Sequence, residues 1–297
     1  MTDFEFYHQL IDNYDKEKYN LLKAQTFDPN HFGFPPIYYK IMETDTKRVG
    51  AFVAAFEKHN NLKDAVVCEA GIGNLALTRH FLPYVKKAYL IENNPDLKDY
   101  IIDEIERLGF ADKVVLIFDD ALKVELPEPV DFVIAEMMSI FCANEFQVQV
   151  FQHLRQFLKP KGKLIPEKIV NTVQLCNADF EGDFKHYPIN FSRHLPEEMS
   201  LPEEVNTINL YKEENLTIQK EIDIQPLLTG TANAVFLRSY VRLSEGINFT
   251  GTDSLMPPTV LKIDESKIEA NKLIKLHTGY SYGTSLDEAI FSLEEKV

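Results

Sequence analysis

The chain has 297 residues, of which 45% are hydrophobic, and its 31 basic and 46 acidic side chains give a formal net charge of −15. The length allows two packed cores, and the composition is that of an ordinary globular protein. No apolar run approaches the roughly 18 residues of a membrane span, and the acidic first residues show no signal-peptide pattern, so we expect a cytoplasmic protein without a membrane anchor. Three widely spaced cysteines, Cys68, Cys142 and Cys176, predict neither a disulfide framework nor a metal site.

The first 60 residues are predicted to be mainly helical. Helix formers dominate residues 1–25, Phe32–Pro36 interrupts them, and apolar side chains recur at helical spacing from Val49 to Phe56. From residue 64, short apolar strands alternate with helices, which predicts a parallel sheet with helices on both faces. The predicted strands are Ala65–Glu69, Lys87–Glu92, Lys113–Phe118 and Val130–Glu136, and the predicted helices are Leu75–Leu82, Leu97–Leu108 and Glu145–Leu158.

After about residue 168 the alternation of strands and helices fades. Segments such as Ile169–Leu175, Ala234–Leu243 and Lys272–Tyr280 have strand character and are separated by polar loops. They predict an antiparallel β domain of the barrel or sandwich type. We therefore divide the chain into an N-terminal helical segment (1–60), an α/β domain (61–167) and a β-rich domain (168–297).

A glycine turn follows the first predicted strand. In Val66–Leu75 an apolar run leads into Glu69 and then into Gly71 and Gly73. The two glycines let the backbone pass close to a ligand, in front of the N–H groups of a following helix. A third glycine is absent, which counts against the dinucleotide fingerprint and against NAD.

Acidic residues also end the next two predicted strands. Glu92 follows the second strand, 23 residues after Glu69, and a carboxylate there could accept both hydroxyls of a ribose. Asp119 and Asp120 follow the third strand, where a carboxylate or a backbone group could read an adenine amino edge. Three acidic strand ends in succession suit a positively charged adenosyl ligand better than a pyrophosphate. The alternative is that each acid only caps the helix that follows it.

Two glutamates, nine residues apart, flank the loop after the fourth predicted strand. Glu136 ends that strand, and Glu145 is expected to open the next helix. The planar N–H groups of a guanidinium pair well with carboxylates, so these two side chains could clamp a guanidinium or another cation. The net charge of −15 is compatible with a cationic substrate, although acidity also simply aids solubility. For Glu145 alone a structural role is also open, because an anion is favourable in the first turn of a helix.

This ordered set of motifs resembles the class I S-adenosylmethionine-dependent methyltransferases, and the glutamate loop resembles that of the protein arginine methyltransferases. In that family two glutamates at this spacing hold the substrate guanidinium, and a methionine matching Met138 lies beside the reacting centre. Met42–Arg48 matches the family's Met-x-x-Asp-x-x-Arg helix, which implies that Arg48 pairs with the methionine carboxylate of the cofactor. His31–Gly33 resembles the N-terminal segment that folds over the cofactor.

The resemblance, whose motifs cover roughly residues 27–170, implies a Rossmann-like class I methyltransferase domain with N-terminal helices and a C-terminal β-barrel-like domain. It also implies S-adenosyl-L-methionine as cofactor, a cationic guanidino or amino substrate and a homodimer. The residues that it assigns to the cofactor are His31, Met42, Arg48, Glu69, Gly71, Gly73, Glu92, Asp119 and Asp120. Those that it assigns to catalysis are Glu136, Glu145 and Met138.

The chain departs from the family pattern around the expected substrate. It contains no tryptophan, so the family's Thr-His-Trp loop is absent, and the nearest candidate, Pro257–Val260, keeps only the threonine. Met137 stands after Glu136, where an aromatic residue is commonest, and Ser139 replaces a glycine. His277 is a candidate to replace the missing histidine.

Two other functions stay open. Residues 71–82 and 119–127 also resemble the ribosomal RNA adenine dimethyltransferases, whose base pocket uses an Asn-(Leu/Ile)-Pro-(Tyr/Phe) motif. Here Ala135–Met138 occupies that place, and the acidic chain repels a phosphate backbone. The other possibility is a methyltransferase-like protein that binds a partner without catalysis.

Overall fold

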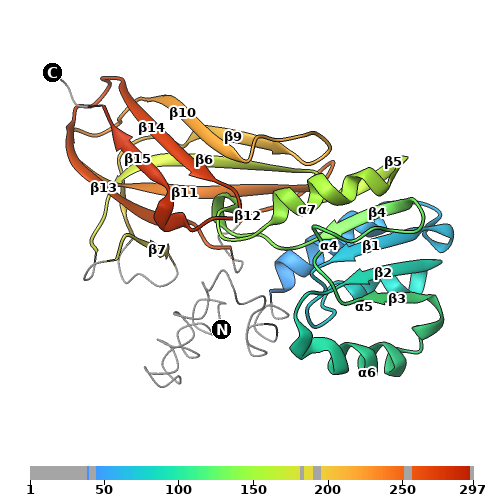
Figure 1. The fold of residues 1–297 in the computed structure, drawn as a ribbon. Coiled ribbons are helices and arrows are strands. Elements are labelled where there is room, and N and C mark those ends of the chain that lie inside the picture. The colour runs from blue at the N-terminus through green and yellow to red at the C-terminus, as the bar shows by residue number, and fades with distance from the viewer. Residues whose placement is uncertain (1–38, 40–44, 181–183, 190–194, 251–255, 295–297) are drawn as a thin grey trace.

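The computed structural model describes residues 39, 45–180, 184–189, 195–250 and 256–294. Within these residues a parallel sheet and an antiparallel β region lie side by side (Figure 1). Both contribute to one continuous hydrophobic core, and a second, smaller cluster lies within the β region. His31 and Met42, which the sequence assigns to the cofactor, lie outside the described residues.

Five parallel strands form the first sheet, in the order β3-β2-β1-β4-β5. The four predicted strands are confirmed to within one residue at each end, because each is a short apolar run; every residue of β1 is buried, whereas β3 at the edge of the sheet is only partly buried. The chain order reverses between β1 and β4, and ligands of such sheets bind at the carboxyl ends of the strands beside that point. The strands are β1 (Val66–Ala70), β2 (Lys87–Ile91), β3 (Val114–Ile117), β4 (Val130–Ala135) and β5 (Leu158–Ile165).

Four described α-helices accompany this sheet, and their bounds correct two of the predictions. Leu75 adopts a left-handed conformation (φ 68°), so the helix predicted over Leu75–Leu82 begins only at Thr78. The helix predicted over Glu145–Leu158 begins at Gln147, so Glu145 does not open it. The helices are α4 (Thr46–Glu57), α5 (Thr78–Phe81), α6 (Lys98–Leu108) and α7 (Gln147–Leu154). Short 3-10 helices occupy Leu62–Asp64, Leu82–Tyr84, Pro95–Leu97, Ala111–Lys113, Ile140–Cys142, Arg155–Phe157 and Leu286–Glu288.

Ten strands among the described residues form the antiparallel β region that the sequence predicts. The larger sheet has the order β7-β13-β11-β6-β8, with β12 paired to β11 and β9 paired to β6, and the smaller sheet has the order β10-β14-β15. The strands are β6 (Lys168–Asn177), β7 (His186–Pro188), β8 (Glu197–Glu198), β9 (Glu203–Asn209), β10 (Thr217–Ile224), β11 (Gly230–Ser244), β12 (Ile247–Thr250), β13 (Thr259–Ile268), β14 (Ile274–Ser281) and β15 (Ile290–Leu293).

Helix α4 lies where the two regions meet (Figure 1). Its Phe52 ring lies 6.2 Å from the ring of Phe249 in β12, and its Phe56 ring lies 5.0 Å from that of Phe132 in β4. The helix therefore connects the parallel sheet to the β region through apolar contacts, and it brings its first turn to the carboxyl end of β4. Among the described residues, none of the helices combines the length and apolarity needed to span a bilayer.

The buried strands predict a clear difference between two isoleucines. Ile91 in β2 is 1% exposed, whereas Ile290 in β15 is 66% exposed. Ile91→Ala should lower the free energy of unfolding by about 2–5 kcal/mol, because it removes apolar contacts and leaves a cavity. Ile290→Ala should change it by about 0.5 kcal/mol or less. Urea unfolding followed by circular dichroism measures both, and equal losses would contradict the burial of β2.

Candidate active site

The candidate site lies at the carboxyl ends of β1, β2 and β4, next to the point where the strand order reverses. Three segments meet there: the glycine turn after β1, the acidic end of β2 and the glutamate loop after β4. The first turn of α4 reaches the same place, because Arg48 contacts Glu136. The topology of the sheet thus brings together motifs that are up to 88 residues apart in the chain.

The glycine turn places residues 71, 73 and 75 in left-handed conformations. Their φ values are 71° for Gly71, 52° for Gly73 and 68° for Leu75. A Cβ atom added at Gly71 would lie 3.0 Å from Cγ of Met137, and one added at Gly73 would lie 2.8 Å from Cδ1 of Tyr39. Close neighbours therefore require both glycines. Leu75 is the third residue of this turn in a left-handed conformation. The sequence did not predict this, because a leucine rarely adopts that conformation, which costs roughly 1–2 kcal/mol.

Glu92 ties the end of β2 to this turn. Its Oε2 accepts a hydrogen bond from the N–H of Gly73 at 2.8 Å, and its Oε1 accepts one from the N–H of Asn94 at 2.8 Å. Burial raises the pKa of Glu92 above its ordinary value, although these backbone bonds oppose that effect. Each carboxylate oxygen keeps a further lone pair, so the side chain fits the expected role towards two ribose hydroxyls.

The structure gives other acidic residues of the set internal partners. Glu69 lies inside β1, where it accepts a hydrogen bond from the hydroxyl of Thr78, and burial raises its pKa to about 8. Asp119 is exposed and accepts the N–H of Asp120 at 2.7 Å. Asp120 forms an ion pair with Lys123 at 3.0 Å. Cofactor roles for these three residues stay predictions.

Arg48 is bound to one of the two glutamates predicted to hold substrate. Its Nη1 donates to Oε2 of Glu136 at 2.5 Å, and its own N–H donates to Asp45, the residue that caps α4. Burial alone would lower the pKa of Arg48, but three nearby carboxylates outweigh burial and hold that pKa above its ordinary value. These carboxylates are Glu136, Asp45 and Glu145.

Glu136 and Glu145 come close enough to influence each other. Glu136 directly follows β4, and Glu145 lies two residues before α7. The pKa of Glu145 is raised to about 8. The main cause is the removal of its carboxylate from water, and the second is the nearby charge of Glu136, whereas the charge of Arg48 lowers the pKa. Because α7 begins later than predicted, a role for Glu145 in its first turn no longer explains the residue. Met138, the third predicted catalytic residue, is buried in the same loop.

Gln147 holds the backbone on both sides of Glu136, a role that no sequence motif indicates. Its Nε2 donates to the carbonyl of Ala135 at 3.0 Å, and its Oε1 accepts from the N–H of Met137 at 2.8 Å. The side chain is fully buried. Only the return of α7 onto β4 reveals these contacts, since ten residues or more separate Gln147 from its partners.

The glutamate loop also contacts the β region. The ring of Phe141 lies 5.2 Å from that of Tyr280 in β14, and the carbonyl of Cys142 accepts from the N–H of Gly283 at 3.0 Å. His277 lies on the opposite face of β14 from Tyr280 because side chains alternate along a strand. His277 instead lies 3.5 Å from Glu221 in β10, so it does not replace the missing histidine at this loop.

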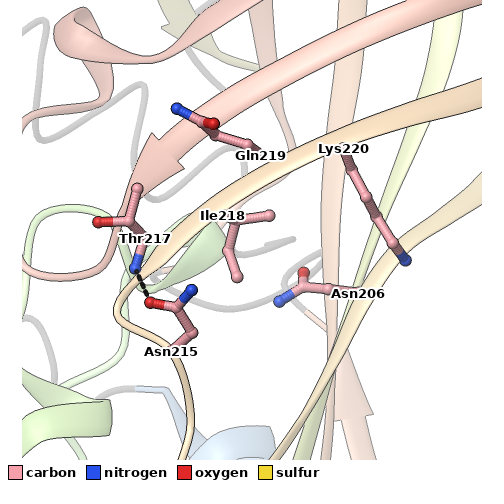
Figure 2. A pocket seen from close by; sticks show the side chains of 6 residues that line it. All are labelled: Asn206, Asn215, Thr217, Ile218, Gln219 and Lys220. Atoms are coloured by element: carbon pink, nitrogen blue, oxygen red, sulfur yellow. Dashed lines mark hydrogen bonds between the residues drawn. The ribbon is translucent and has the colours of Figure 1, made fainter.

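A separate cavity of about 400 Å³ opens at the surface of the β region (Figure 2). It lies along β9 and β10, and its polar side chains largely bond within the protein; Lys220, for example, donates to the carbonyl of Val205 at 2.7 Å. The lining residues are Asn206, Asn215, Thr217, Ile218, Gln219 and Lys220.

The contacts of Gln147 predict a measurable contribution to stability. Gln147→Met keeps the length of the side chain but leaves the carbonyl of Ala135 and the N–H of Met137 without their partner. The free energy of unfolding should fall by about 1–3 kcal/mol. In the control, Gln152→Met, one hydrogen bond to the carbonyl of Glu214 is lost at a half-buried site, and the loss should be about 1 kcal/mol or less. Urea unfolding compares the two variants, and equal losses would argue against the described contacts of Gln147.

Comparison with known sequences finds that no family model matches the chain. An uncharacterized protein of Methanocaldococcus jannaschii is 28% identical over 255 residues, which are 85% of this chain and 95% of that protein. Another, of Methanothermobacter thermautotrophicus, is 24% identical and covers 86% of this chain and 97% of that protein. The histone-arginine methyltransferase CARMER of Drosophila ananassae is 30% identical over 107 residues, but these are 36% of this chain and only 20% of that protein.

Among solved structures, the fold is similar to that of a chain of the Trypanosoma brucei PRMT1 enzyme-prozyme heterotetrameric complex with AdoHcy. The TM-score is 0.69 at 15% sequence identity, and the match covers 80% of this chain and 85% of that chain. The similarity therefore extends well beyond the residues of the parallel sheet. The chain has an arginine-methyltransferase-like fold, in which a Rossmann-like α/β domain precedes a C-terminal β domain.

Proposed function

We propose that this protein is an S-adenosylmethionine-dependent N-methyltransferase whose substrate nitrogen, guanidino or amino, is held by Glu136 and Glu145. One observation carries the proposal: Glu136 already binds a guanidinium, that of Arg48, while Glu145 lies beside it. No described residue donates a hydrogen bond to the carboxylate of Glu145, so this acid is available to a ligand. Carboxylates pair with guanidinium groups through short, charge-assisted hydrogen bonds.

The glycine turn and the end of β2 support the proposed cofactor. When bound, S-adenosylmethionine supplies a methyl group that its sulfonium has already activated. Glu92 would accept the ribose hydroxyls, the turn at Gly71 and Gly73 would lie against the ligand, and Arg48 would pair with its carboxylate. The AdoHcy in the Trypanosoma brucei complex and the partial match to CARMER favour the same ligand.

The two glutamates would orient the substrate and control its charge. An arginine side chain is a poor nucleophile while it is protonated, because its pKa is above 12. Carboxylates on two of its nitrogens would draw the positive charge away from the third, which attacks, and would favour the loss of a proton. Glu145 is the candidate proton acceptor because its pKa of about 8 lies near a working pH. Gln147 and Arg48 would keep Glu136 in place.

The finer parts of the proposal follow from the resemblance. We propose that the protein is a homodimer, which light scattering of the purified chain tests. We also propose a cytoplasmic location and domain boundaries after residues 60 and 167. Both a protein and a small guanidino compound fit the substrate class. The net charge of −15 disfavours the alternative of an RNA substrate.

Replacing Glu136 by an uncharged residue of the same shape tests the clamp. Glu136→Gln should lower the transfer of labelled methyl into fractionated cell extract by about 100-fold or more, because it removes charge that acts on the transition state. Affinity for S-adenosylmethionine, measured by calorimetry, should change by about twofold or less, because the glutamine oxygen can still accept the hydrogen bond from Arg48. Glu125→Gln, the same change at an exposed residue, is the control. Wild-type activity in Glu136→Gln would rule out the clamp, and label in RNA would favour the alternative substrate.

The raised pKa of Glu145 predicts a pH dependence of substrate binding. Below about pH 8 the free protein holds a proton on Glu145, and a cation must displace it, so affinity for an arginine peptide should rise up to about pH 8 and then level off. The stability of the folded protein depends on pH in the opposite direction. The pKa of Glu145 in the folded protein lies above its ordinary value of 4.5. Its contribution to stability is therefore fully present below pH 4.5 and is lost as the pH rises through about 8.

Calorimetric titrations between about pH 6 and about pH 9.5 measure this dependence. Glu145→Gln should bind the peptide more weakly and lose the rise in affinity, which separates Glu145 from Glu69, whose pKa is also raised to about 8. A wild-type affinity that does not change over this range would contradict the assignment.

A further inference from the structure

A chain of buried polar groups runs through the β region and ends on the glutamate loop. Phe141, in the middle of that loop, is fully buried and adopts a left-handed conformation with φ of 59°. Its N–H donates to Oγ of Ser239 in β11 at 3.0 Å, and this hydroxyl donates to Oδ1 of Asn171 in β6 at 2.7 Å. Ser239 and Asn171 are direct partners in the β6–β11 ladder.

The chain continues outwards to the surface cavity. Nδ2 of Asn171 donates to Oδ1 of Asn206 at 3.1 Å and to the hydroxyl of Tyr280 at 3.4 Å. The hydroxyl of Tyr280 donates to the same oxygen of Asn206 at 2.8 Å. Asn206 borders the cavity (Figure 2), and its Nδ2 donates to the hydroxyl of Tyr282 at 2.5 Å. The ring of Tyr280 also packs against that of Phe141. The network therefore contacts the loop at two points, through Ser239 and through Tyr280.

Phe141 is the point at which such a network can control the two carboxylates. It lies five residues after Glu136 and four before Glu145. A left-handed conformation is unfavourable for a phenylalanine and persists only where its surroundings impose it. A buried network whose members are all hydrogen-bonded is rigid and defines one arrangement. The course of the loop between the glutamates therefore depends on groups in the β region.

We propose that Ser239 is a positioning residue for the Glu136–Glu145 pair, with Asn171 and Asn206 as its support. By accepting the N–H of Phe141, Ser239 keeps the two carboxylates at the separation that a guanidinium requires. The inference rests on the proposed function of that pair. It gives the β domain a direct part in the geometry of the site.

Ser200 provides a matched control in the same β region. Ser239 and Ser200 are both 2% exposed, and the hydroxyl of Ser200 likewise accepts a backbone N–H, that of Leu175, at 3.0 Å. It donates to the carbonyl of Leu201 at 2.9 Å. Changing either serine to alanine leaves one buried N–H without its acceptor, so both variants should lose similar stability. Only Ser239 contacts the glutamate loop.

The experiment compares Ser239→Ala, Ser200→Ala and Ser239→Thr in methyl transfer, cofactor binding and thermal unfolding. Ser239→Ala should lower kcat about 10- to 100-fold, the effect of displacing a reacting group by about 1 Å, without weakening cofactor binding. Ser200→Ala should keep the wild-type kcat, and Ser239→Thr, which retains the hydroxyl, should recover most of the activity. Equal kcat values for the two alanine variants would overturn the proposal. Should Ser239→Ala fail to fold, Asn206→Ala at the cavity tests the same network and should also lower kcat.

Amide hydrogen exchange separates this inference from the proposed function. The N–H of Phe141 should exchange faster in Ser239→Ala than in Ser200→Ala, whatever the reaction is. A wild-type protein that transfers no methyl group would overturn the proposed function, while the exchange rates would still show whether Ser239 holds the loop. Active wild-type protein with unchanged exchange at Phe141 in Ser239→Ala would overturn the positioning role alone.

Discussion

The ion pair between Arg48 and Glu136 is the interaction on which the arrangement of the site depends. It joins the first turn of α4 to the end of β4, and the side chain of Arg48 is only 7% exposed. Removing one member of such a buried pair leaves a charge without its partner, which is strongly destabilising. The pair therefore fixes α4 over the carboxyl edge of the sheet, and the apolar contacts of Phe52 and Phe56 hold the rest of the helix to both regions.

The parts of the fold that depend on local patterns could be predicted from the sequence. The strands from β1 to β4 are short apolar runs, and Gly71, Gly73 and Glu92 meet because parallel strands bring their carboxyl ends to one edge. The start of α7 could not be predicted, since its first residue, Gln147, is fixed by hydrogen bonds to β4. The register that sets Ser239 opposite Asn171 joins residues 68 apart, and no local pattern carries that information.

The chain contains no tryptophan and therefore lacks the Thr-His-Trp loop of the arginine methyltransferases, yet its glutamate loop is closely supported. The turn after β14 contacts it from the β region: Gly283 donates to the carbonyl of Cys142, and the N–H of Leu286 donates to Oδ1 of Asn144 at 3.1 Å. A Cβ atom at Gly283 would lie 2.7 Å from Nε2 of Gln149 in α7, so the turn fits closely against the helix. Support for the loop thus comes from β11 and from the turn after β14.

The raised pKa values of three of the acids argue against helix capping as their only role. An acid that only caps a helix in solvent has its pKa lowered by the backbone N–H groups that bind it, whereas burial raises the pKa of Glu69, Glu92 and Glu145. Buried carboxylates are unfavourable unless they are hydrogen-bonded or paired. The hydroxyl of Thr78 donates to Glu69 and two backbone N–H groups donate to Glu92, whereas the half-buried Glu145 receives no hydrogen bond from any described residue. A cationic group bound between Glu136 and Glu145 would supply the hydrogen bonds that Glu145 does not receive from the described residues. The proposed substrate is therefore a cation.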